Sequence, residues 1–306
     1  MTPLLFTLEP HLPLLMPLAR GLRADIGTLN RRRFPDGESY LKVDTPVSGR
    51  HCVLLANLVD PDSKFLPLVF VAATLKEMAA ASVGLVAPYL SYMRQDTRFS
   101  DGEVVTSKIF ARLVSVELDW LVTVDPHLHR YRSLEEIYSV PTHSVAGAPM
   151  LAQWLAQRNE ELLLVGPDIE SEQWVSAIAE QIQQPFIIGR KKRRGDRDVT
   201  VTLPDMRAHK HRTAVIIDDV VSSGHTLLKT LKALKNADVE RIDCATVHGI
   251  FADGVDETLR REGVRELISS NSIPHPSNAV DLSPVLVGPI EQQLAACQAR
   301  ASGVIA

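Results

Sequence analysis

The sequence predicts an α/β protein whose sheets are mainly parallel and covered by helices. Two observations support this fold class. Short runs of apolar and β-branched residues alternate with segments of helical length along the whole chain. Many of these runs are apolar at every position, as strands buried on both faces are, and such strands belong to parallel sheets flanked by helices. Ligands of such sheets bind at the carboxyl ends of the strands, so residues that follow strands are the first candidates for chemistry.

The expected strands and helices follow one another in a regular order. Strands are expected to begin at Leu4 (LLFTL), Tyr40 (YLKV), Cys52 (CVLLANL), Ser82 (SVGLVAPY), Trp120 (WLVTVD), Glu161 (ELLLVGPD), Phe186 (FIIGR), Val199 (VTVTL), Thr213 (TAVIIDD), Arg241 (RIDCATV) and Arg265 (RELISS). Apolar residues recur at helical spacing in 107–118, 147–158, 171–183 and 225–236. We further expect a buried helix at 66–75 and a C-terminal helix at 289–300.

The length of the chain indicates how many domains it has, and its net charge limits the ligands that it binds. A chain of 306 residues suggests two domains of about 150 residues each. A polar loop at 141–147 predicts domains 1–145 and 146–306, with the last helix packing back onto the N-terminal half. The net charge of −4 disfavours a protein that binds nucleic acid mainly through its phosphates.

Cysteine usage and hydropathy predict a cytoplasmic protein. Cys52, Cys244 and Cys297 form no metal-binding spacing and no disulfide framework. Prolines interrupt the N-terminal apolar stretch, which therefore makes a poor signal peptide. The longest apolar run reaches only about half a membrane span, so no membrane partner is expected.

The most informative segment is VIIDDVVSSGHTLLK, residues 215–229. An apolar strand at 214–217 is followed by two acids and a hydroxyl-rich turn before a helix: Asp218, Asp219, Ser222, Ser223, Gly224, His225 and Thr226. Hydroxyls and free N–H groups at a helix N-terminus suit a phosphate monoester, and the acids could hold sugar hydroxyls or a metal. The alternative is an ordinary capped helix, because Ser and Thr are good caps. Two consecutive acids ending a buried strand are costly without a function, which favours a site.

This segment resembles the phosphoribosyl-pyrophosphate (PRPP) loop of the type I phosphoribosyltransferase fold. Four other segments resemble those of ribose-phosphate pyrophosphokinase (PRPP synthetase), in that family's order: RRFPDGESYLKV at 32–43, PYLSYMRQDTRF at 88–99, TVDPHLH at 123–129 and VGPDIESEQWV at 165–175. The resemblance implies two phosphoribosyltransferase-like domains, each a mainly parallel sheet flanked by helices. It also implies transfer of the β,γ-diphosphoryl group of ATP to the anomeric hydroxyl of ribose 5-phosphate, giving PRPP and AMP.

The resemblance assigns roles to individual residues. ATP would be bound by Phe34, Asp36, Glu38, Arg94, Gln95, Asp96 and His127. Mg²⁺ would be held by His127 and Asp168, and ribose 5-phosphate by the acids and turn at 218–226. The family's adenine-binding segment, with its stacking Phe34, comes from a neighbouring subunit, so a homo-oligomer is implied.

The same segments have simpler interpretations when each is taken alone. Residues 35–37 would then be a plain turn, which is the better interpretation in isolation. Residues 94–96 would be a solvated polar loop, although Arg94 can bind phosphate oxygens in a fork. His127 would mark a strand end.

The densest charge run is RKKRRGDR at 190–197, a pattern that usually forms a solvated face. It follows the strand at 186–188, where the family has a catalytic flexible loop with a Lys-x-Arg pair that neutralises the transferring phosphates. Lys191 with Arg193 is the preferred register, and Lys192 with Arg194 is the competing one.

Departures from the common bacterial pattern indicate a divergent, archaeal-like branch. Ser222 replaces an Asp, His225 replaces a Gly, and 169–172 replaces a glycine-rich stretch. These changes bear on effectors and hexamer assembly rather than on catalysis. Two alternatives stay open: a phosphoribosyltransferase that consumes PRPP, and a non-catalytic regulatory partner of a PRPP synthetase.

Overall fold

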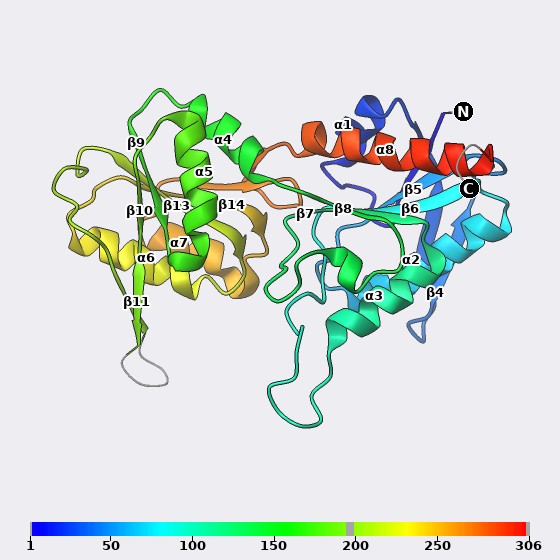
Figure 1. The fold of residues 1–306 in the computed structure, drawn as a ribbon, viewed down its shortest axis with the longest axis horizontal. Coiled ribbons are helices and arrows are strands. Elements are labelled where there is room, and N and C mark those ends of the chain that lie inside the picture. The colour runs from blue at the N-terminus through cyan, green and yellow to red at the C-terminus, as the bar shows by residue number, and fades with distance from the viewer. Residues whose placement is uncertain (1, 194–198, 304–306) are drawn as a thin grey trace. The chain divides into compact units, whose positions relative to one another are not determined.

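The computed structural model describes residues 2–193 and 199–303 of the chain. The chain divides into unit 1, residues 1–146 with 283–306, and unit 2, residues 147–282. Each unit contains a six-stranded parallel sheet flanked by helices (Figure 1), which confirms the predicted fold class. No helix in the described part of the chain is long and apolar enough to span a membrane.

Unit 1 is built on a sheet in which all neighbouring strands are parallel. Their order is β2 (Asp25–Ile26), β1 (Leu4–Thr7), β5 (His51–Leu55), β6 (Ser82–Ala87), β7 (Trp120–Val124) and β8 (Thr142–Val145). Around it lie α1 (Leu15–Gly21), α2 (Asp62–Glu77), α3 (Thr106–Glu117), the short η1 (Leu134–Glu136) and α8 (Ser283–Ala301). The central strands β5, β6 and β7 are buried throughout, as their continuous apolar pattern predicts.

A separate antiparallel hairpin projects from unit 1. Its strands are β3 (Leu29–Arg33) and β4 (Ser39–Val43), and residues 34–38 form its tip. Arg31 ties the hairpin to α2, because its Nη2 donates to the carbonyl oxygen of Ser63 at 3.0 Å. The turn requires Gly37, whose φ is +94°.

Unit 2 repeats the architecture. Its sheet has the order β10 (Phe186–Ile188), β9 (Leu162–Gly166), β13 (Thr213–Val221), β14 (Ile242–Gly249), β15 (Leu267–Ser270) and β16 (Asn278–Val280). Its helices are α4 (Ala148–Ala156), η2 (Ile169–Ser171), α5 (Glu172–Ile182), α6 (His225–Asn236), η3 (Ala252–Gly254) and α7 (Val255–Arg261). A two-stranded ribbon, β11 (Arg190–Arg193) with β12 (Val199–Thr202), follows β10.

Strand β13 is longer than the sequence predicts. Its pairing with β9 ends at Ile216, but its pairing with β14 continues to Val221, which lies opposite Gly249. Asp218 and Asp219 therefore lie within the strand, as the expected run TAVIIDD has them, on a stretch that has a neighbouring strand on one side only.

A network of charged side chains joins the amino ends of the strands in unit 2. The Asp243 side chain is fully buried and lies 2.6 Å from Arg265 Nη2 and 3.1 Å from Arg158 Nη2. Glu160 accepts from Arg158 at 2.6 Å, from Arg265 at 3.0 Å and from the Thr213 hydroxyl at 2.7 Å. Removing one partner from such a group leaves a charge buried and uncompensated, which is strongly destabilising.

This network predicts a loss of stability in acid. Hydrogen bonds from Arg265, Thr213 and Arg158 lower the pKa of Glu160 from 4.5 to about 2 despite its partial burial. A lowered pKa stabilises the fold above the unfolded value, and that contribution is lost as pH falls from about 4.5 towards 2. Urea unfolding at a series of pH values should show this loss in the wild type and a weaker pH dependence in Glu160→Gln. The exposed Glu240→Gln is the control, and parallel pH dependence in wild type and Glu160→Gln would contradict the assignment.

Candidate functional site

The turn between β13 and α6 is shaped by Gly224. This residue has φ +65° and directly precedes the helix. A Cβ at this position would lie 2.3 Å from Cγ2 of Val255. Glycine is therefore needed for its backbone conformation and for the space that Val255 occupies.

The first turn of α6 begins after a glycine and, within the described residues, no side chain forms a capping hydrogen bond at this helix terminus. The alternative interpretation from sequence, a helix capped by its own Ser or Thr hydroxyls, is therefore not what the structure shows. Backbone N–H groups at a helix N-terminus favour anions, so this end of α6 suits a phosphate.

The loop at 250–252, directly after β14, supports this turn through backbone hydrogen bonds. The carbonyl oxygen of Val221 accepts from the N–H groups of Ile250 and Phe251, at 2.9 and 3.0 Å, and that of Ser222 accepts from Ala252 at 3.1 Å. Phe251 has the unusual φ of +47°. The sequence analysis did not single out this loop, because it acts through backbone N–H groups that any residue type supplies.

Three carboxylates influence one another in unit 2. Burial raises the pKa of Asp218 well above its usual value, and the charges of Asp219 and Asp168 raise it further. Asp168 is held in place because its Oδ1 accepts from the N–H groups of Glu170 and Ser171, at 3.1 and 3.3 Å. A cation or a donor of hydroxyl hydrogen bonds would relieve the repulsion among these acids.

In unit 1 two loops leave the same edge of the sheet. They follow the adjacent parallel strands β6 and β7, and they carry the RQD segment and the VDPHLHR segment. Arg94 and Gln95 are exposed, whereas Asp96 is buried. Tyr131 of the second loop donates its hydroxyl to the carbonyl oxygen of Asp96 at 3.1 Å, so the loops hold each other.

Asp96 and the two histidines lie at the junction of these loops. Asp96 Oδ1 lies 2.9 Å from Arg130 Nη1, and Oδ2 lies 3.4 Å from His129 Nδ1. Burial alone would raise the pKa of Asp96, but the hydrogen bond and the charge of Arg130 hold it below its usual value. His127 is exposed, and its ring stacks on His129 with centroids 5.9 Å apart. The structure thus brings Arg94, Gln95, Asp96 and His127 into one region, with Asp96 covered.

The hairpin tip presents the remaining predicted nucleotide-binding residues. Phe34, Asp36 and Glu38 are all exposed, and Asp36 Oδ1 accepts from the Glu38 N–H at 3.2 Å. The Arg32 guanidinium carbon lies 4.6 Å from the Phe34 ring centroid and 4.1 Å from that of Tyr40. Cation–π contacts of this kind fix the orientation of the Phe34 ring.

Models of two known protein families match the two halves of the chain. The N-terminal domain of ribose phosphate pyrophosphokinase matches residues 4–116, and the phosphoribosyl transferase domain matches residues 133–284. The chain belongs to the ribose-phosphate pyrophosphokinase family.

Relatives in this family align along most of the chain. The ribose-phosphate pyrophosphokinase of Methanobrevibacter smithii is 29% identical over 278 residues, which cover 87% of this chain and 92% of the relative. The ribose-phosphate pyrophosphokinase of Methanopyrus kandleri is 28% identical, and the alignment covers 90% of this chain and 94% of the relative. Phosphoribosylpyrophosphate synthetase from Mycobacterium smegmatis superposes with a TM-score of 0.82 at 21% identity, covering 96% of this chain and 99% of that one, and shows the same fold.

The basic run that resembles the family's catalytic loop is described only in part. Lys191, Lys192 and Arg193 belong to strand β11, whose backbone pairs antiparallel with β12. Arg194 lies outside the described residues, as do the side chains of 191–193. The choice between the two Lys-x-Arg registers therefore stays a prediction.

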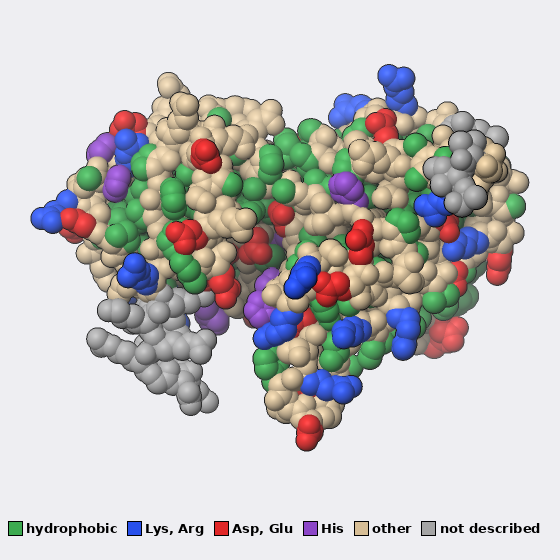
Figure 2. All heavy atoms as spheres, in the orientation of Figure 1, with side chains coloured by type: hydrophobic (Ala, Val, Ile, Leu, Met, Phe, Trp, Pro, Cys, Tyr) green, Lys and Arg blue, Asp and Glu red, His purple; other side chains and the backbone are tan. Residues whose placement is uncertain are grey.

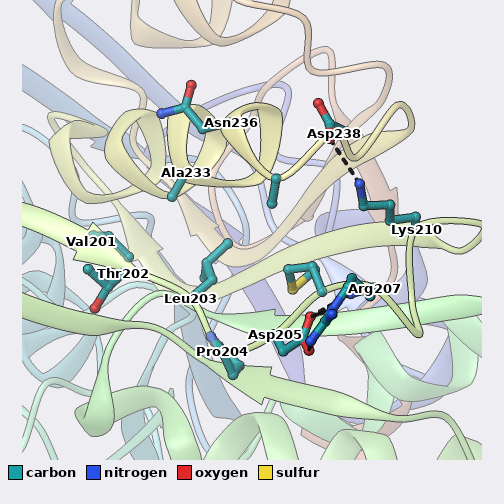
Figure 3. A pocket seen from close by; sticks show the side chains of 12 residues that line it. Val201, Thr202, Leu203, Pro204, Asp205, Arg207, Lys210, Ala233, Asn236 and Asp238 are labelled. Atoms are coloured by element: carbon teal, nitrogen blue, oxygen red, sulfur yellow. Dashed lines mark hydrogen bonds and ion pairs between the residues drawn. The ribbon is translucent and has the colours of Figure 1, made fainter.

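A pocket of about 450 Å³ lies elsewhere in unit 2, beside β12 and the C-terminal part of α6 (Figure 3). Its charged side chains are paired: Arg207 with Asp205 at 2.6 Å and Lys210 with Asp238 at 2.9 Å. Because these cations already have partners, the pocket is not a candidate for the phosphate chemistry of the family.

Proposed function

We propose that the protein is a ribose-phosphate diphosphokinase that makes PRPP and AMP from ATP and ribose 5-phosphate. One observation carries the proposal. The same chain combines an uncapped helix N-terminus beside paired acids, which suits a sugar phosphate, with loops after β6 and β7 that present Arg94, Gln95 and His127, which suit a nucleoside triphosphate. Family membership supports both assignments.

In this reaction the anomeric oxygen of the sugar attacks the β-phosphorus of ATP. The bond from that phosphorus to the oxygen bridging it to the α-phosphorus breaks, AMP leaves with the bond electrons, and the proton of the anomeric hydroxyl is released to solvent. Such transfers depend on positioning and on charge neutralisation more than on covalent help from the protein. We assign the positioning of the sugar to 218–226: first-turn N–H groups and the hydroxyls of Ser222, Ser223 and Thr226 bind its phosphate, and Asp218 and Asp219 accept from its hydroxyls.

The charge that develops on the diphosphoryl group needs cations close to it. We assign this role to Lys191 and Arg193, with Arg94 and Gln95 binding the nucleotide. Cations placed where charge grows in the transition state contribute more to the rate than to ground-state binding.

The residues present fit a bound Mg²⁺ ion. Mg²⁺ usually keeps several waters and is held by one or two carboxylates together with substrate phosphates. No three His, Cys, Asp or Glu side chains in the described ranges are grouped so that they could hold a metal ion by themselves. The acids whose charges raise the Asp218 pKa supply hard oxygen donors, and we nominate Asp168 and His127 as protein ligands. When bound, the ion neutralises phosphate charge.

We further propose a cytoplasmic homo-oligomer in which the hairpin tip completes the ATP site of a neighbouring subunit. The exposed Phe34 supports this, because an aromatic ring held in place and left in solvent is suited to stacking on a base. Exposed apolar side chains on α2 (Leu66 and Phe70) and α3 (Leu113 and Val116) offer surface that another subunit would cover. The three cysteines are free and buried, consistent with a reducing compartment.

Product analysis tests the proposed function. Phosphorus NMR of the purified protein with ATP, ribose 5-phosphate and Mg²⁺, without any nucleobase, should show AMP and PRPP accumulating together. A phosphoribosyltransferase that consumes PRPP would leave both substrates intact and would release diphosphate from PRPP when a base is added. No turnover under any of these conditions would favour the regulatory alternative.

A further inference from the structure

Arg130 lies at the meeting point of the two loops in unit 1. It follows the VDPHLH segment directly, and its Nη1 is 2.9 Å from Asp96 Oδ1 and 2.8 Å from His129 Nδ1. Its guanidinium carbon also lies 5.0 Å from the centroid of the Phe99 ring. The guanidinium is thus held at its edge by a carboxylate and on its face by an aromatic ring.

Asp96 is buried, whereas Arg130 and Phe99 are exposed. The Asp96 side chain is 2% exposed, so its charge requires a permanent cationic partner. The Arg130 side chain is 40% exposed, and Phe99 is 75% exposed. Asp96 therefore anchors the arginine from the protein side, and the Arg130 side chain as a whole stays partly open to solvent.

Arg130 has donors to spare. Guanidinium carries five N–H groups, and the side-chain hydrogen bonds of Arg130 within the described part of the chain all come from Nη1. Nε and Nη2 form the kind of planar fork that binds phosphate oxygens in pairs. Asp96 cannot take this role, because a buried carboxylate and a phosphate are both acceptors.

We propose that Arg130 binds the polyphosphate of the nucleoside triphosphate and that Asp96 is its positioning residue. The inference rests on the proposed function, because Arg94, Gln95 and His127 mark these loops as the nucleotide site. The sequence analysis expected Asp96 to contact ATP. In this proposal Asp96 instead holds Arg130, and Arg130 contacts the polyphosphate.

The test compares Arg130→Gln, Arg130→Lys and Asp96→Asn by calorimetric titration with ATP and Mg²⁺, and separately with ribose 5-phosphate. We expect Arg130→Gln to weaken ATP binding roughly 10-fold or more, the scale of a lost hydrogen bond to a charged group. Arg130→Lys should recover part of the affinity, and Asp96→Asn should weaken ATP binding less than Arg130→Gln does. Ribose 5-phosphate affinity should not change. Arg132→Gln, an exposed arginine on the same loop, is the matched control and should bind ATP normally.

A double variant separates a loss of ATP binding from a loss of folding. Arg130→Gln leaves Asp96 buried without its cation, whereas Asp96→Asn with Arg130→Gln removes both charges. The double variant should melt closer to the wild type than Arg130→Gln does and still bind ATP weakly. Normal ATP affinity in the double variant would overturn the inference and leave Arg130 with a structural role.

The outcomes also separate this inference from the proposed function. If the wild type makes PRPP and Arg130→Gln binds ATP normally, only the inference fails. If the wild type makes no PRPP, the proposed function fails, and the binding comparison still decides whether Arg130 contacts a nucleoside triphosphate.

Discussion

Lys191→Ala is expected to lower the rate of PRPP formation by roughly 10²-fold or more, the scale for removing one group that stabilises transition-state charge. The proposed reaction moves a diphosphoryl group between two oxygens, and negative charge shifts towards the AMP that leaves. A cation near that path lowers the barrier without being needed to hold either substrate. Steady-state AMP formation should therefore show a fall in kcat, while ribose 5-phosphate affinity, measured by titration, should stay near that of the wild type.

Lys192→Ala is the matched control for this prediction. Both residues belong to β11, and the two Lys-x-Arg registers differ by one position. Lys192→Ala should retain near-normal turnover. The reverse result would transfer the role to Lys192 and Arg194, and near-normal turnover in both variants would refute a catalytic role for this run.

Asp219→Ala is expected to impair the use of ribose 5-phosphate far more than the binding of ATP. Asp219 lies on the part of β13 that pairs only with β14, and its backbone is fixed because its carbonyl oxygen accepts from Thr246 Oγ1 at 3.1 Å. Its carboxylate is held as well, because Oδ1 accepts from the Val220 N–H at 2.8 Å. A carboxylate fixed in this way can accept from sugar hydroxyls at little entropic cost. Each hydrogen bond to a charged group contributes roughly 10-fold or more in affinity, so KM for ribose 5-phosphate should rise on that scale.

The readouts for Asp219→Ala are KM for ribose 5-phosphate and calorimetric affinity for ATP. Asp238→Ala, which removes an exposed acid of the same unit, controls for the loss of negative charge. Weakened ATP binding with unchanged sugar affinity would contradict the assignment.

Much of the fold could be predicted because buried parallel strands carry an uninterrupted apolar pattern. The predicted helix at 225–236 has the same bounds as α6, since its apolar spacing and its preceding glycine agree. Strands without that pattern were missed. Strand β8 falls in the predicted polar loop at 141–147, because an edge strand with half-exposed Thr, His and Val needs no apolar run. Strand β3 is basic for most of its length and is supported by β4 alone.

Contacts between side chains that are far apart in the sequence could not be predicted from the sequence. The helix expected to be buried at 66–75 exists as part of α2, but its Leu66 and Phe70 are exposed, because apolar content does not show which face is covered. The sequence places Asp96 beside Arg94 and Gln95, and its contact with ATP stays a prediction. Its burial and its pairing with Arg130, which is 34 residues away, had no sequence signal.

The contribution of α8 to unit 1 bears on how the chain is made. Leu286, Ile290 and Leu294 are buried, and their helix packs on α1, β7 and β8, all encoded in the first half. Unit 2 is contiguous and emerges from the ribosome before α8 does. The N-terminal sheet must therefore wait, with apolar surface open to chaperones or to wrong partners, until unit 2 and then α8 have been made.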